Sequence, residues 1–126
     1  MKKLCLLLML QCAVFTLFAQ QPATRPNMPE PVNTMKDKQE YQGYTIRLMP
    51  ALPTPQSIGS YGFDILKDNK PLVHQFQSPL LSPKGLQKKD DAYKVAQWMI
   101  KEYNKTGHWQ TMVPPHIANE LKIETN

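Results

Sequence analysis

The chain has 126 residues, with 15 Lys and Arg against 10 Asp and Glu and a formal net charge of +5 at pH 7. This length suits one small domain. The basic residues are spread along the chain, and no basic stretch is interleaved with aromatic side chains, so the pattern typical of nucleic-acid binding is absent.

Residues 1–19, MKKLCLLLMLQCAVFTLFA, have the pattern of an export signal. A positive start precedes an apolar run over residues 4–14, and Ala19 provides a small residue at the cleavage position. The run is interrupted by Gln11 and is shorter than the about 20 residues that span a bilayer. We therefore expect cleavage near Gln20 and export to the periplasm, the cell surface or the medium, with no integral membrane segment left in the mature protein.

Both cysteines, Cys5 and Cys12, lie inside this signal. Cleavage after Ala19 leaves 107 residues with a formal charge of +3, no thiol nucleophile and no disulfide. Small exported domains often depend on disulfides for their stability. Because the mature chain can form none, its stability is expected to depend on its apolar core alone.

Residues 20–40, QQPATRPNMPEPVNTMKDKQE, contain four prolines among polar residues. Such a segment cannot bury enough apolar surface to offset its ordering entropy, so we predict a mobile, extended tether. A polyproline ligand for a partner is the alternative, but no clean P-x-x-P repeat with basic anchors is present. The folded domain is then expected over residues 41–126.

Alternating apolar residues predict three strands. Tyr44, Ile46 and Leu48 alternate with polar residues in the first strand. The stretch 50–59 is rich in proline and predicts a loop. A second alternation over residues 61–66 is followed by the turn KDNK, in which Asp68 and Asn69 tolerate positive φ and favour a tight hairpin.

The return strand PLVHQFQ leaves open which of its faces is buried. Leu72, His74 and Phe76 share one face, but Val73 on the other face is also apolar.

An amphipathic helix is predicted from Lys88 to Thr106, with Gly107 as its left-handed C-terminal stop. Its apolar stripe consists of Ala92, Val95, Ala96, Met99, Ile100 and Tyr103. We expect Val95 and Ile100 to bury against Phe63, Ile65 or Leu72. The tail HIANELKI suggests one more helical turn, docked through Leu121. The predicted fold class is therefore α+β, a three-stranded, mostly antiparallel sheet with one long helix packed on one face.

The candidate catalytic residues form no recognisable site. His74, His108 and His116 lack the spacing of zinc ligands, so no metal site is expected. No G-x-S-x-G motif surrounds a serine and no Gly-rich phosphate loop is present, so neither a catalytic serine nor a cofactor is expected. Asp64 is interpreted as an outward-facing strand residue and Glu102 as a solvated helix residue, rather than as paired glycosidase carboxylates. Trp98 and Trp109 are expected to cover the core, although Trp109 could also stand exposed as a contact residue.

Three segments carry a family resemblance: YGFDILKDNKPLVHQ (61–75), KKDDAYKVAQWMIKEYNKTG (88–107) and VPPHIANEL (113–121). Together they resemble a family of small exported bacterial domains of unknown function that is common in Bacteroidetes. Helices of that family typically begin with Ser or Thr in a capping box, whereas this chain has Lys88 at that position. The resemblance covers most of the mature chain and implies no catalytic residue.

We therefore expect a non-catalytic interaction or accessory module of the cell envelope, with another envelope protein as its partner. The alternative is a module that binds a small ligand or a glycan through Trp109, His74 and the proline-rich loop. An enzyme without a recognisable site is the third possibility, because no nucleophile, base and orienting residue can be assembled.

Overall fold

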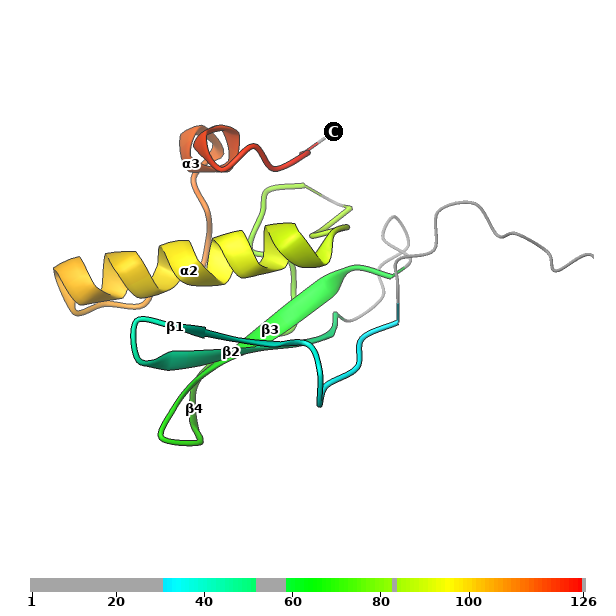
Figure 1. Ribbon diagram of the computed structural model, residues 1–126. Coiled ribbons are helices and arrows are strands. Elements are labelled where there is room, and N and C mark those ends of the chain that lie inside the picture. Colours follow the sequence, from blue (N-terminus) through cyan, green and yellow to red (C-terminus); the bar gives the residue numbers. More distant parts are fainter. Residues whose placement is uncertain (1–30, 52–58, 83, 126) are drawn as a thin grey trace, which may run out of the picture.

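The computed structural model describes residues 31–51, 59–82 and 84–125, and in these ranges four strands form one antiparallel sheet beneath a long helix (Figure 1). The strands follow one another in the order β1 (Lys38–Tyr41), β2 (Tyr44–Pro50), β3 (Tyr61–Lys67) and β4 (Lys70–Gln75). Helices α2 (Lys89–Thr106) and α3 (Pro115–Glu120) come after the sheet. The predicted α+β class is confirmed, and within the described ranges no helix is long and apolar enough to cross a bilayer.

Two tight turns set the register of the sheet. Asp68 and Asn69 have φ values of 51° and 62° between the paired residues Lys67 and Lys70. Positive φ at both central residues is the geometry whose twist matches that of the adjoining strands, so the predicted hairpin is confirmed. The turn between β1 and β2 also has positive φ at both central residues, Gln42 and Gly43.

The fourth strand, β1, corrects the expectation of a tether that extends to residue 40. Residues 20–30 lie outside the described ranges, but residues 31–40 belong to the domain. Val32 packs on the core, and the N–H of Asn33 donates to Asp37 Oδ2 at 2.7 Å. Lys89 of α2 pairs with the same oxygen at 3.0 Å. Composition alone missed β1 because its four residues, KQEY, are almost entirely exposed and gain their order from pairing with β2.

The core lies between α2 and the sheet face that it covers (Figure 1). Val95, Ile100, Phe63 and Ile65 are completely buried there, as predicted. The prediction was wrong for Leu72, which is 45% exposed. Val73 packs on the core instead, which settles the face of the return strand that the sequence left open.

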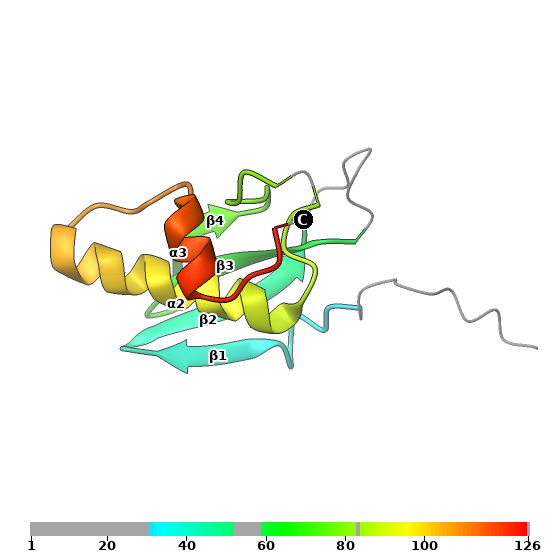
Figure 2. The ribbon, with the colours of Figure 1, turned by 90° about the horizontal axis from the view of Figure 1, so that it is seen from above.

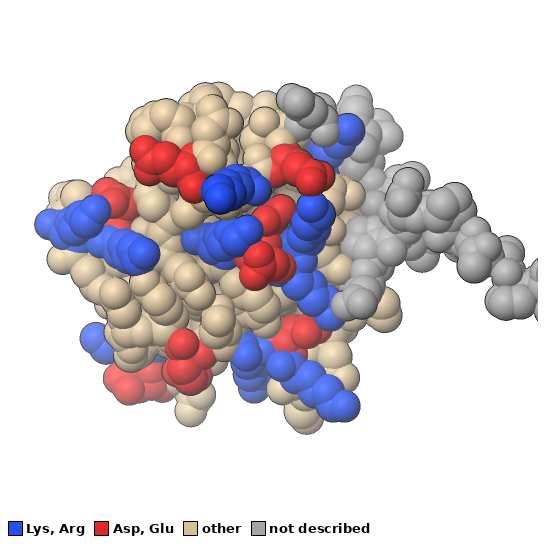
Figure 3. Space-filling model, turned by 45° about the horizontal axis from the view of Figure 1, so that its top comes forward, with Lys and Arg blue, Asp and Glu red and all other residues tan. Residues whose placement is uncertain are grey.

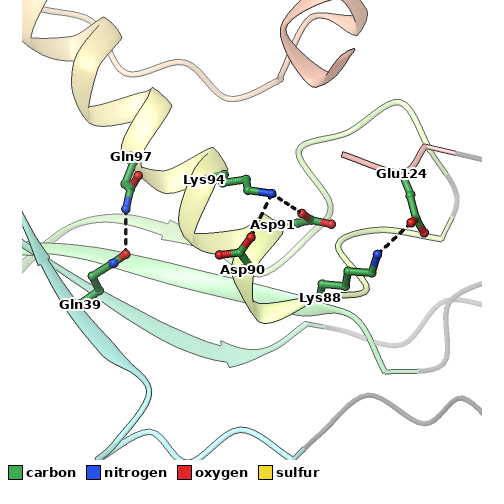
Figure 4. Close-up of polar contacts among 7 residues, drawn as sticks. All are labelled: Gln39, Lys88, Asp90, Asp91, Lys94, Gln97 and Glu124. Atoms are coloured by element: carbon green, nitrogen blue, oxygen red, sulfur yellow. Dashed lines mark hydrogen bonds and ion pairs between the residues drawn. The ribbon is translucent and has the colours of Figure 1, made fainter. Parts of the chain in front are cut away.

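Charged side chains hold the start of α2. Lys88 at the N-cap does not cap the helix with its side chain, and the ammonium of Lys94 pairs with Asp90 at 2.9 Å and with Asp91 at 3.3 Å (Figure 4). The side chain of Lys88 reaches Glu124 of the tail at 2.8 Å. The helix ends as predicted, because Gly107 has a φ of 74° and its N–H donates to the Tyr103 carbonyl at 2.7 Å.

The short helix α3 lies over α2 in the view from above (Figure 2). Its attachment depends on Ala118 and Ile123, both buried in the core cluster. The Val113 N–H also donates to the Pro79 carbonyl at 2.8 Å. The additional helical turn is therefore confirmed, while the residue expected to dock it, Leu121, is only half-buried.

Candidate functional site on the open face of the sheet

The sheet face opposite α2, here called the open face, carries a row of polar residues. Lys38 lies opposite Arg47, Arg47 opposite Asp64, and Asp64 opposite His74, so each of the four strands contributes one residue. Directly opposite residues point to the same side of a sheet. Their strand neighbours Ile46 and Ile65 are buried on the helix side, so this polar row lies on the open face.

Asp64 is the centre of the polar row. Its Oδ2 accepts hydrogen bonds from Arg47 Nε at 3.2 Å and Arg47 Nη2 at 2.5 Å. Its Oδ1 lies 2.5 Å from His74 Nδ1. Because a carboxylate only accepts, His74 must carry its proton on Nδ1 to make this bond. The arrangement therefore fixes the orientation of the imidazole and leaves Nε2 for an external group.

Burial differs sharply along the polar row. The side chain of Asp64 is only 5% exposed, whereas those of Arg47 and His74 are 39% and 60% exposed. A buried carboxylate is costly to desolvate, and its pairing with cations often only compensates for that cost. A net gain in fold stability is therefore a weak explanation for the buried carboxylate of Asp64. The arrangement is better suited to holding two partly exposed side chains in fixed positions.

An irregularity in β4 places apolar groups beside the polar row. Leu66 pairs with Pro71 but Ile65 pairs with Val73, so Leu72 is an extra residue without a partner on β3. Such a bulge re-aims side chains at a sheet edge. The bulged residue, Leu72, is exposed. Phe76 is 38% exposed, and the centroid of its ring lies 5.1 Å from that of the His74 ring.

Gly62 permits the close approach of β4 at this place. A Cβ on Gly62 would lie 2.5 Å from the Gln75 carbonyl oxygen and 3.1 Å from Phe76 Cα. No real Cβ tolerates the first distance. The Tyr-Gly-aromatic sequence therefore has a structural role, because only glycine lets the chain of Gln75 and Phe76 pass next to β3.

The two predicted contact residues do not form one site. His74 belongs to the polar row, whereas Trp109 lies at the C-terminal end of α2. The Trp109 ring stacks on Tyr103 with centroids 4.1 Å apart and meets the Tyr44 ring edge-on at 6.0 Å. These contacts, and its packing on the core, give Trp109 a covering role, and Trp98 also packs on the core.

The expected separation of Asp64 and Glu102 agrees with the structure. Glu102 lies on α2, where it pairs with Lys105 at 2.9 Å, and Asp64 lies on the open face. Asp64 points away from the helix-covered core, as expected of an outward strand residue, and Arg47 and His74 cover it there. The alternation of β2 places Arg47 on the polar face, but its pairing with Asp64 depends on register, which the sequence does not show.

Two other surfaces of the domain differ from the open face. Over α2 and α3, positive and negative side chains are interspersed and neither sign forms a patch (Figure 3). A pocket of about 310 Å³ lies between α3, the C-terminal tail and the loop that joins β4 to α2, lined by Leu80, Leu81, Val113, Pro115, Ala118, Asn119 and Thr125. None of these lining residues is charged, so the pocket offers no charged group that would orient a ligand.

In the part of the chain that the structure describes, no three His, Cys, Asp or Glu side chains lie close enough to hold a metal ion. Comparisons with protein-family models, with curated proteins and with solved structures gave no significant match to this chain.

Proposed function

We propose that the protein is a non-catalytic interaction or accessory module of the cell envelope and that it contacts its partner through the open face of the sheet. The observation that carries this proposal is the buried Asp64 carboxylate, which holds the partly exposed Arg47 and His74 on a rigid strand surface. Preorganised side chains lose little entropy on binding, so such a surface favours recognition.

The neighbours of His74 support binding rather than nucleophilic catalysis. An Asp-oriented histidine can act as a base for a nucleophile within hydrogen-bond reach. The four described strands place no serine or cysteine on the open face, and the one hydroxyl there, that of Thr45, donates to Glu40 at 2.7 Å. The exposed Leu72 and Phe76 add apolar area of the kind that protein partners bury.

The export signal and the family resemblance agree with an envelope role, and both are part of the proposal. Photo-crosslinking in cells that express the full chain tests the role of the open face. A benzophenone amino acid at Phe76 is expected to give a discrete adduct with another envelope protein. The same group at Lys105 on α2, which is also exposed, is the matched control. Adducts of equal yield from both positions, or none from Phe76, would contradict the proposal.

A further inference from the structure

We infer that the open face recognises an acidic segment of a partner protein, with a carboxylate held by Arg47 and His74 and a neighbouring apolar side chain packed beside Phe76. This inference rests on the proposed function and specifies the chemistry of the partner. It depends on the hydrogen-bonding groups that the polar row does not use internally.

The carboxylates of the open face already have donors. Asp64 accepts three hydrogen bonds from Arg47 and His74, and Glu40 accepts one from Thr45. Neither acid therefore requires an external cation. The acidic side of the polar row is satisfied within the molecule.

The donors of the polar row are in surplus. Arg47 uses Nε and Nη2 for Asp64, and its Nη1 has no hydrogen-bond partner among the described residues. His74 uses Nδ1 for Asp64, and its Nε2 has no hydrogen-bond partner among the described residues. Lys38, exposed and directly opposite Arg47, adds another cation to the same row. Charge complementarity therefore favours an anionic group, and the planar guanidinium suits a carboxylate.

The apolar neighbours indicate that the carboxylate belongs to a polypeptide. Leu72 and Phe76 lie on the same edge of the sheet as His74, and both are more than one-third exposed. A free carboxylate would leave these side chains in water, whereas a peptide with an aromatic or aliphatic residue next to its acid would cover them. A second copy of this chain fits poorly, because two identical faces would oppose their surplus donors.

The test is an NMR titration of the full mature chain with the blocked peptide Gly-Glu-Phe-Glu-Gly. Shifts are expected at Arg47, His74 and Phe76. Replacing both acids of the peptide with Gln is expected to weaken binding about tenfold or more, the usual loss for a charge-assisted contact. Arg47→Gln should cause a similar loss, while Lys105→Gln, a matched loss of one cation on α2, should leave binding unchanged.

Three results would overturn the inference: no shifts on the open face at any accessible peptide concentration, equal binding of the Gln peptide, or full binding by Arg47→Gln. Sodium acetate and vesicles containing phosphatidylglycerol serve as further arms. Equal shifts with acetate would indicate a free-anion site, and stronger binding to the vesicles would indicate a lipid surface. If Phe76 still gives crosslinks in cells but the peptide does not bind as expected, the proposed interaction role stands and the inference of an acidic partner is rejected.

Discussion

The two faces of the sheet remove their central residues from water in different ways. Under α2, apolar side chains such as Phe63 and Ile65 are completely buried by packing. On the open face, Asp64 is nearly as buried, but it is covered by the side chains of Arg47 and His74, which themselves stay partly exposed. The first face accounts for the stability of the domain, whereas the second holds polar groups in place at the surface. Substitutions on each face separate these roles.

The largest expected effect is that of Ile100→Ala on the helix-covered face. Ile100 is completely buried, so truncation removes transfer energy and leaves a cavity. The free energy of unfolding should fall by about 2–5 kcal/mol. Urea titration measures this loss, and Glu102→Ala on the polar side of α2 is the control, with an expected change below about 0.5 kcal/mol. Equal damage from both variants would mean that α2 packs through a different side.

Gly62→Ala tests how closely β4 approaches β3 on the open face. The added Cβ would meet the Gln75 carbonyl oxygen at 2.5 Å, and relief requires the backbone to shift. The expected cost is about 1–3 kcal/mol, measured by urea titration. Truncating Met49, whose side chain is also close, should not rescue the variant because the main clash is with backbone. Rescue by Met49→Ala would show that the clash lies with the side chain instead.

Asp64→Asn should lower the stability of the domain only modestly. Its main effect should be on the orientation of the His74 and Arg47 side chains on the open face. The amide cannot accept charge-assisted bonds at both positions, but Arg47 and His74 are exposed enough to be hydrated. We expect a loss of about 1–2 kcal/mol in the free energy of unfolding. The His74 ring resonances should broaden or shift as the imidazole loses its fixed orientation. Asp68→Asn in the hairpin turn is the matched control and should leave both quantities unchanged, since asparagine suits its positive φ. Unchanged His74 resonances in Asp64→Asn would contradict the orienting role.

The smallest effect is expected at the edge of the helix-covered face, where Asp37 joins the N-terminal segment to α2. The hydrogen bond from Lys89, followed by that from the Asn33 backbone, lowers the pKa of Asp37 below its ordinary value of 3.8. Its contribution is therefore fully present above pH 3.8 and is lost as the pH falls through the lower folded-state pKa. The Asn33 amide resonance should report this transition in an acid titration, and Asp37→Asn should abolish it. An Asn33 resonance that titrates unchanged in that variant would assign the transition to another group.

The sequence by itself determined the elements whose signals are local. The stripe of α2, its stop at Gly107 and the turn at Asp68-Asn69 follow from apolar spacing and from backbone conformations that few residues tolerate. It also separated Asp64 from the core face, since alternation along a strand is a local property. Only the tertiary structure decided the rest. β1 has one aromatic residue, Tyr41, and no apolar alternation, and it forms by pairing with β2. The bulge at Leu72 decided which side of β4 is buried. The polar row joins residues from four strands, so it depends on register, and register arises from turns and packing of the whole sheet rather than from any one segment.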